Sequence, residues 1–112
     1  MNQLIVGYYF RIYGTKKEKY DKLMTWEIVV TGKVQGVFFR ASTKAKAREL
    51  GLNGWVRNHM NGSVIIKVQG EESMLKSFLE WVHQGPERAI VDQVRWDQVD
   101  EEEEYGDFEV RR

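Results

Sequence analysis

Apolar and polar residues alternate along the chain from Thr25, which is the pattern of a half-buried β-strand. The side of this strand that would face a core carries Trp26, Ile28 and Val30. Residues 41–50 follow a different pattern, because they are rich in alanine, lysine and arginine and are followed by a glycine. Such a segment is typical of a helix closed by a C-terminal glycine, so we expect a strand followed by a helix.

A second strand and its hairpin partner follow this helix. Residues 55–58 have the composition of a short strand, and residues 63–69 carry apolar side chains at every second position. The inward positions of residues 63–69 are Val64, Ile66 and Val68. Asn61 and Gly62 lie between the two strands and give a strong hairpin signal, because both residues tolerate positive φ. We therefore predict a β-hairpin at this place.

A second helix begins after Gly70, with acidic residues in its first turn, and ends at Gly85-Pro86. Its apolar positions have the i, i+3, i+4, i+7 spacing of a helix that lies on a sheet, and they are Leu75, Phe78, Leu79 and Val82. Two further strands are predicted, one over residues 89–96 and a short one around residues 108–110. The inward positions expected in residues 89–96 are Ile90, Val94 and Trp96.

The predicted order of elements is β-α-β-β-α-β with an additional short C-terminal strand. Two split βαβ units with right-handed crossovers give a mainly antiparallel sheet with two helices on one face. We therefore expect residues 25–112 to form one α+β domain, a ferredoxin-like two-layer sandwich. Residues 1–24 are more basic than the rest and would be an N-terminal extension of unclear role, either an interaction arm or an added segment. Within it, Leu4 to Phe10 is a candidate extra strand.

The composition narrows the possible functions. A chain of 112 residues with 42% hydrophobic residues can bury one core, and its formal net charge of zero gives no general attraction to nucleic acid or to an anionic membrane. The absence of cysteine excludes disulfides, thiolate catalysis and cysteine-based metal sites. No apolar run approaches the roughly 20 residues of a membrane span, and the start lacks the features of a secretory signal. We expect a cytoplasmic monomer that binds neither nucleic acid nor membrane.

Residues 32–40 read GKVQGVFFR and join the first predicted strand to the first predicted helix. Gly32 would end the strand and Gly36 would lie in the turn, so the backbone can bend and present successive N–H groups to one anion. The following helix adds the positive end of its dipole, and Arg40 offers a planar fork for two phosphate oxygens. We predict a phosphoryl-binding turn; the alternative is an ordinary strand-to-helix connection with Arg40 as a surface cation.

Asn58 ends the second predicted strand. Because the first two strands run parallel in a split βαβ unit, their carboxyl ends lie at the same edge of the sheet. With the third strand between them, these ends would be roughly 10 Å apart, close enough for Arg40 and Asn58 to share one small ligand. We predict that Asn58 positions a water molecule there; the alternative is a turn asparagine that leads into the hairpin.

Three motifs together resemble the acylphosphatase family, namely GKVQGVFFR, LGLNGWVRN and the hairpin sequence NGSV. The resemblance covers roughly residues 26–111 and includes the closing residues Phe108, Val110 and Arg111. It implies a ferredoxin-like, metal-independent enzyme without a cofactor, which hydrolyses the carboxyl-phosphate bond of small-molecule acyl phosphates. Asn61 and His59 depart from the family pattern, where aspartate and a small polar residue are frequent. We expect His59 to lie on the surface, and the alternative is that it tunes substrate access.

The resemblance also implies roles for individual residues. Arg40 would bind the phosphate together with three backbone amides, and Asn58 would orient the attacking water. The three amides are those of Gln35, Gly36 and Val37. Thr43, in the first helical turn, would either bond the backbone or support the phosphate turn, and the resemblance favours support. Because a carboxylate leaves without protonation, such an enzyme needs no general acid, and we infer that the substrate's own phosphate assists the water.

Two other functions are compatible with the predicted fold. An RNA-binding module would need exposed aromatic residues on its third strand, and residues 63–69 contain none. A domain that handles carbamoyl phosphate would belong to a larger maturation enzyme, whereas we expect this chain to act alone. No metal site is predicted, because His83 has no partner at ligand spacing and Glu101 to Glu104 would be a solvated charge run.

Overall fold

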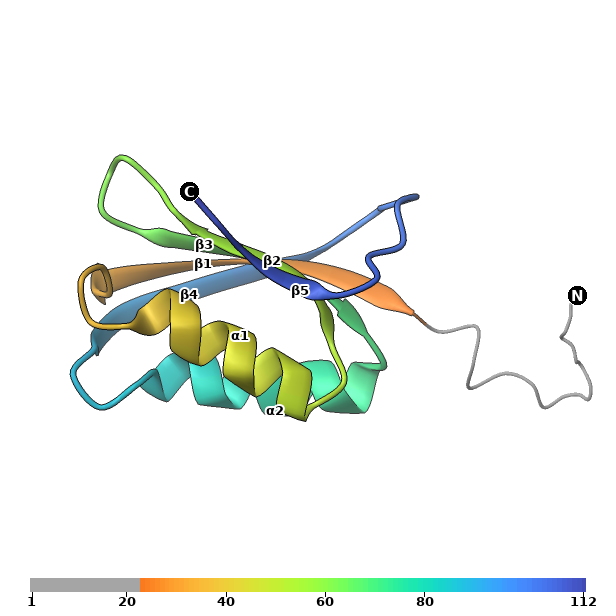
Figure 1. Cartoon of the computed structure of the whole chain (residues 1–112), viewed down its shortest axis with the longest axis horizontal. Helices are drawn as coiled ribbons and strands as arrows, with labels where there is room; N and C mark the ends of the chain where they lie inside the picture. The colour runs from red at the N-terminus through yellow and green to blue at the C-terminus, as the bar shows by residue number, and fades with distance from the viewer. Residues whose placement is uncertain (1–22) are drawn as a thin grey trace, which may run out of the picture.

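The computed structural model describes residues 23–112, and the candidate strand at residues 4–10 lies outside the described residues. Each helix and strand predicted after Thr25 is present, with its ends shifted by a few residues. Figure 1 shows the elements, which in chain order are β1 (Met24–Lys33), α1 (Phe39–Glu49), β2 (Asn53–Asn58), β3 (Val64–Gly70), α2 (Glu72–Gln84), β4 (Ile90–Val99) and β5 (Phe108–Arg111).

The strands form one five-stranded sheet in the order β4-β1-β3-β2-β5. Neighbouring strands are antiparallel except β2 and β5, which are parallel. Both helices cover the same face of the sheet (Figure 1), and neither is long and apolar enough to cross a membrane. This is the two-layer, ferredoxin-like sandwich that the sequence predicts, so the predicted fold is confirmed. β3 lies between β1 and β2 and is antiparallel to both, so the carboxyl ends of β1 and β2 lie at the same end of the sheet, as expected.

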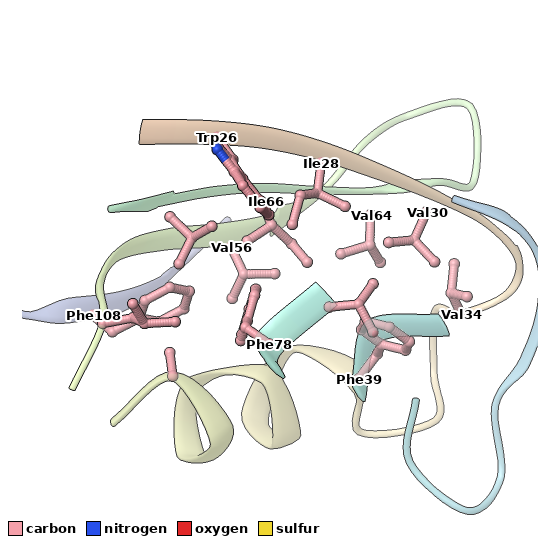
Figure 2. Packing of buried hydrophobic residues seen from close by; sticks show 14 of the residues in the cluster. Trp26, Ile28, Val30, Val34, Phe39, Val56, Val64, Ile66, Phe78 and Phe108 are labelled. Atoms are coloured by element: carbon pink, nitrogen blue, oxygen red, sulfur yellow. The ribbon is translucent and has the colours of Figure 1, made fainter. Parts of the chain in front are cut away.

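The core lies between the sheet and the two helices (Figure 2). Alternation along β1 buries Trp26, Ile28 and Val30, as predicted. The same alternation and the stripe on α2 bury six more predicted positions, which are Val64, Ile66, Val68, Leu75, Phe78 and Val82. Burying one such side chain contributes about 1.5–3 kcal/mol, so contact between the layers is the main stabilising term. This core holds the carboxyl ends of β1 and β2 in fixed positions.

The predicted inward face of β4 is wrong at its start. Ile90 is 60% exposed, whereas Val91 packs against the core. The reason is a β-bulge at Asp92, because the pairing of β4 with β1 shifts there by one residue. One extra residue exchanges the two faces of a strand. Beyond the bulge, Trp96 lies on the predicted side and its ring centroid is 4.2 Å from that of Trp26, although it remains 47% exposed.

The β2–β3 hairpin is confirmed, but its turn differs from the expected one. The amide of Gly62 donates to the carbonyl of His59 at 3.0 Å, so the turn spans residues 59–62. Gly62 has a φ of 95°, while Asn61 does not have positive φ. The side chain of Asn61 contributes instead, because its Oδ1 accepts hydrogen bonds from the amide and the hydroxyl of Ser63, at 3.0 and 2.6 Å. Such a side-chain bond is a usual property of asparagine in turns.

The acidic segment after β4 is not fully solvated. Lys67 donates a hydrogen bond from Nζ to Oε1 of Glu101 at 3.0 Å. This contact raises the pKa of Lys67 and lowers the pKa of Glu101. The predicted solvated run is therefore wrong at Glu101 and confirmed at residues 102–104, which are exposed. The pair ties the segment between β4 and β5 to the sheet.

Candidate active site

The connection between β1 and α1 is shorter than the predicted turn. β1 runs through Lys33, so Gly32 belongs to the strand and the predicted strand end at Gly32 is wrong. A Cβ at Gly32 would collide with the carbonyl oxygen of Ile90, so this glycine permits the close approach of β4. The connection itself is residues 34–38, in which Gly36 has a φ of 74°, a value that favours glycine.

None of the amides of residues 34–38 donates to an acceptor among residues 23–112, and the three predicted donors, those of Gln35, Gly36 and Val37, are among them. Of these three residues, Gly36 lines the cavity described below, and Gln35 and Val37 do not. The first turn of α1 follows directly; its amides lack partners by the geometry of a helix, and it carries no acidic side chain. The side chain of Val37 is buried in the core and fixes the connection in place. Free amides next to the positive end of a helix dipole favour an anion.

Phe38, the residue before α1, has an unusual backbone. Its φ of 65° and ψ of 24° place it in the left-handed region, where it is the one described residue other than glycine with positive φ. For an L-residue this conformation costs roughly 1–2 kcal/mol. Its ring is also 73% exposed. The sequence gives no signal for this conformation, because bulky residues rarely adopt it.

Arg40 lies in the first turn of α1, and its guanidinium group is positioned by β5. Its Nη1 donates a hydrogen bond to the carbonyl oxygen of Arg111 at 3.2 Å. No other hydrogen bond of the Arg40 side chain occurs among the described residues, so most of the five N–H donors of the guanidinium are free. The direction of Arg40 thus depends on the end of the last strand, which its position in the sequence does not show.

Asn58 is the last residue of β2, and its Oδ1 is buried without a hydrogen-bond partner among the described residues. Gly36, Arg40 and Asn58 line one cavity of about 340 Å³, so the structure brings these predicted residues together. The other residues that line it are Val34, Phe38, Phe39, Ala41 and Val110. A buried carbonyl oxygen without a hydrogen-bond partner destabilises the folded state. We therefore expect a ligand or a water molecule to donate a hydrogen bond to it.

The side chain of Gln35 has a structural function that the sequence does not indicate. Its Nε2 donates to the carbonyl oxygens of His59 and Ser63 at 2.8 and 2.9 Å. These two bonds attach the β1–α1 connection to the β2–β3 hairpin. His59 does not line the cavity, and its Nδ1 accepts a hydrogen bond from the amide of Asn61 at 3.2 Å. Gln35 therefore has two functions: its backbone amide is a predicted phosphate donor, and its side chain attaches the connection to the hairpin.

Thr43 and the histidine of α2 add no polar contact to the site. Thr43 is fully buried in α1, does not line the cavity, and its hydroxyl has no hydrogen-bond partner among the described residues. His83 has its Nδ1 2.9 Å from the carbonyl oxygen of Leu79, in its own helix. Within residues 23–112, no three histidine or carboxylate side chains are grouped so that they could hold a metal ion.

Known proteins are similar to this chain in both sequence and fold. A family model described as Acylphosphatase matches residues 26–110. An acylphosphatase of Marinobacter nauticus is 54% identical over 83 residues, which are 74% of this chain and 90% of that protein. The structure of an acylphosphatase from Coxiella burnetii has a TM-score of 0.79 at 41% identity and covers 84% of this chain and 98% of that one. The crystal structure of acylphosphatase from Bacillus subtilis has a TM-score of 0.77 at 32% identity, covering 80% and 99%.

The sequence match includes all or most of each described helix and strand, and all residues of the cavity, from the connection after β1 to Val110 in β5. The match in fold is independent of the motifs, because it depends on the sheet order and on the helices that cover one face. Together these findings confirm the resemblance seen in the sequence: the chain belongs to the acylphosphatase family, whose members hydrolyse acyl phosphates.

Proposed function

We propose that this chain hydrolyses the carboxyl-phosphate bond of acyl phosphates, with Arg40 and three turn amides holding the phosphoryl group and Asn58 orienting the water. The observation that supports these roles is the cavity that Gly36, Arg40 and Asn58 line together, where a guanidinium group and a buried amide oxygen without a partner lie beside a connection whose amides are free. The amides are those of Gln35, Gly36 and Val37. Family membership supports the reaction, and the geometry supports the assignment of residues.

The proposed reaction needs few groups. Water attacks phosphorus, the bond between phosphorus and the carboxyl oxygen breaks, and its electron pair leaves with the carboxylate. A carboxylate is stable without protonation, so no general acid is needed at the leaving group. One proton of the water passes to an oxygen of the substrate's own phosphate. The protein then contributes positioning and stabilisation of charge on the phosphoryl oxygens.

Asn58 and Thr43 would have different parts in this reaction. Oδ1 of Asn58 accepts a hydrogen bond from the attacking water, which satisfies the buried oxygen and directs a lone pair of the water at phosphorus. Thr43 contacts no substrate; buried beneath the first turns of α1, it acts as a packing support for the helix that carries Arg40. Substitution of Thr43 would therefore lower stability more than it changes turnover.

Arg40→Gln and Asn58→Ala test the assignment with benzoyl phosphate as substrate and inorganic phosphate as inhibitor. Arg40→Gln removes the charge that holds the phosphoryl group, so it lowers kcat/KM by roughly 10²–10³-fold or more and abolishes inhibition by phosphate. Asn58→Ala lowers kcat by a similar factor but leaves phosphate inhibition unchanged. Arg57→Gln is the matched control, because this arginine lies 5.7 Å from the centre of the Trp55 ring and does not line the cavity. Retained turnover in either site variant contradicts the proposal.

We also propose that the catalytic unit is residues 25–112 and that the chain acts as a monomer. The same benzoyl phosphate assay on the full chain and on a chain that starts at Met24 tests the first part, and equal kcat/KM is expected. Sedimentation of both proteins measures their mass in solution. A large loss of activity in the shorter chain would show that residues 1–23 contribute to the site.

A further inference from the structure

The mouth of the cavity carries exposed apolar surface that the reaction itself does not use. Among the large apolar residues of the lining, Val34 and Phe39 are buried, whereas Phe38 is 73% exposed and Val110 is 41% exposed. These two residues come from different elements, the β1–α1 connection and β5. An aromatic ring and a branched side chain therefore form an exposed apolar wall beside the polar groups that would hold a phosphoryl group.

Phe38 is unfavourable for the free protein in two independent ways. Its backbone lies in the left-handed region, which costs conformational energy for every residue except glycine, and its ring is exposed to water. The core does not need this ring, because it is not part of the buried cluster. Strained residues of this kind are concentrated at functional sites. A contact between the ring and a bound ligand would account for an aromatic side chain at this position.

The position of Phe38 determines which part of a ligand it would meet. It directly follows the three amides proposed to bind the phosphoryl group, precedes Arg40 by two residues and lines the same cavity, so it lies beside the place proposed for the phosphoryl group. In an acyl phosphate, one oxygen atom separates phosphorus from the carbonyl carbon. The substituent on that carbon must therefore leave the polar part of the cavity within a few bond lengths, where Phe38 and Val110 form the wall.

We infer that Phe38 and Val110 form the subsite for the acyl group, and that the enzyme prefers acyl phosphates with an aromatic or branched aliphatic acyl group over acetyl phosphate. This inference rests on the proposed function, because it takes the phosphoryl group to be held by Arg40 and the turn amides. A ring or branched chain buries apolar surface against this wall, whereas the methyl group of acetyl phosphate reaches little of it. Phe38 is thus a specificity-determining residue.

The test compares kcat/KM for benzoyl phosphate and acetyl phosphate in the full-length protein and its variants. Phe38→Ala removes the ring but keeps a left-handed residue with a Cβ, so the ratio of the two kcat/KM values falls roughly tenfold. Phe38→Leu retains apolar bulk and keeps most of the ratio. Ile90→Ala, which removes a similarly exposed side chain from β4, is the control and leaves both activities unchanged. Competitive inhibition by phenylphosphonate and methylphosphonate measures the same preference without turnover.

The outcomes separate this inference from the proposed function. Hydrolysis of neither substrate by the unmodified protein overturns the proposed function and this inference with it. Hydrolysis of both substrates, with the same ratio in the unmodified protein and in Phe38→Ala, overturns the acyl subsite and leaves the proposed function intact. A lower ratio in Phe38→Ala together with weaker relative inhibition by phenylphosphonate supports the subsite. Circular dichroism of each variant confirms that the compared proteins are folded.

Discussion

The β2–β3 hairpin turn and the β1–α1 connection lie side by side, joined by the side chain of Gln35. They differ in whether their backbone amides have hydrogen-bond partners. In the hairpin turn of residues 59–63, the amides of His59 and Gly62 donate to carbonyls of the same turn, and Asn61 Oδ1 accepts from Ser63. In the β1–α1 connection of residues 34–38, no described residue accepts a hydrogen bond from any of the amides. One connection is complete by itself, and the other has hydrogen-bonding groups available for a ligand.

Glycine placement alone does not separate these connections. Gly36 and Gly62 have φ values of 74° and 95°, and a Cβ added at either one would meet no atom within 4 Å. What differs is whether the neighbouring amides have partners. Free polar groups are uncommon within a folded protein unless water or a ligand satisfies them. The comparison supports our proposal that the β1–α1 connection binds the phosphoryl group and that the hairpin supports it.

Alanine at each of these glycines gives the largest expected contrast. Both substitutions impose the same left-handed strain, and each lowers the free energy of unfolding by roughly 1–2 kcal/mol. Gly36→Ala also shifts the amides that would hold the phosphoryl group, so it lowers kcat/KM for benzoyl phosphate roughly 10- to 100-fold. Gly62→Ala leaves kcat/KM within about twofold, because its turn makes no contact with substrate. Urea unfolding and steady-state kinetics measure the two effects, and equal losses of activity would remove the distinction between the connections.

Gln35 couples the two connections, and its removal gives an intermediate effect. Gln35→Leu keeps a branched side chain at this position but loses both hydrogen bonds to the hairpin, to the carbonyls of His59 and Ser63. With its neighbouring support lost, the β1–α1 connection is held less firmly, and we expect the inhibition constant of phosphate to rise about three- to tenfold. Gln98→Leu, on exposed β4, is the matched control. Unchanged phosphate inhibition in Gln35→Leu would show that the amides hold their positions without the hairpin.

The fold can be predicted from the periodicity of apolar residues. The predicted buried face is wrong only where an extra residue interrupts that periodicity. Alternation places Trp26 and Ile28 correctly, because regular strands put every second side chain on one face. It places Ile90 incorrectly because a bulge at Asp92 reverses the faces of β4, and a bulge has no pattern of its own in a single sequence. The pattern also ends the first strand at Gly32, one residue early, because the close approach of Gly32 to Ile90 involves a strand far along the chain.

The predicted site came from topology and motif, and its details depend on contacts between distant segments. Parallel strand ends bring Arg40 and Asn58 to one cavity, which a sequence pattern can indicate. The bond of Arg40 to the carbonyl oxygen of Arg111, and the attachment of Gln35 to the hairpin, join residues that are far apart in sequence. The left-handed backbone of Phe38 could not be predicted either, because the preference of an aromatic residue is for negative φ.

Asn61 tests whether the hairpin is stable because its polar groups are satisfied within the turn. Asn61→Ala removes the acceptor for the amide and hydroxyl of Ser63 and lowers the free energy of unfolding by about 1 kcal/mol, with little change in kcat. Asn61→Asp keeps an oxygen at the same place and retains most of that stability. Chemical denaturation compares the three proteins. An equal loss in both variants would show that the side-chain bonds of Asn61 contribute nothing measurable.

The smallest effect on stability is expected at the C-terminal end of α1. This end belongs to neither of the two connections compared above. Arg48 donates hydrogen bonds to both carboxylate oxygens of Asp107, at 3.2 and 2.7 Å, and this contact, followed by the bond from the amide of Phe108, lowers the pKa of Asp107. Because the pKa of the folded state is depressed, the ionised carboxylate stabilises the fold above the ordinary aspartate pKa of about 4, and this stabilisation is lost as the pH falls through the lowered value.

Asp107→Asn keeps an acceptor for the amide of Phe108 but removes the charge next to Arg48. Its melting temperature should therefore lie slightly below that of the unmodified protein at pH 7, and the difference should shrink steadily once the pH falls below about 4. The effect is small because both partners are largely exposed and screened by water. Turnover and phosphate inhibition at pH 7 should be unchanged, since the pair lies at the end of α1 opposite to Arg40. A difference in melting temperature that grows toward low pH would show that the charge of Asp107 opposes folding, contrary to the geometry of its bond with Arg48.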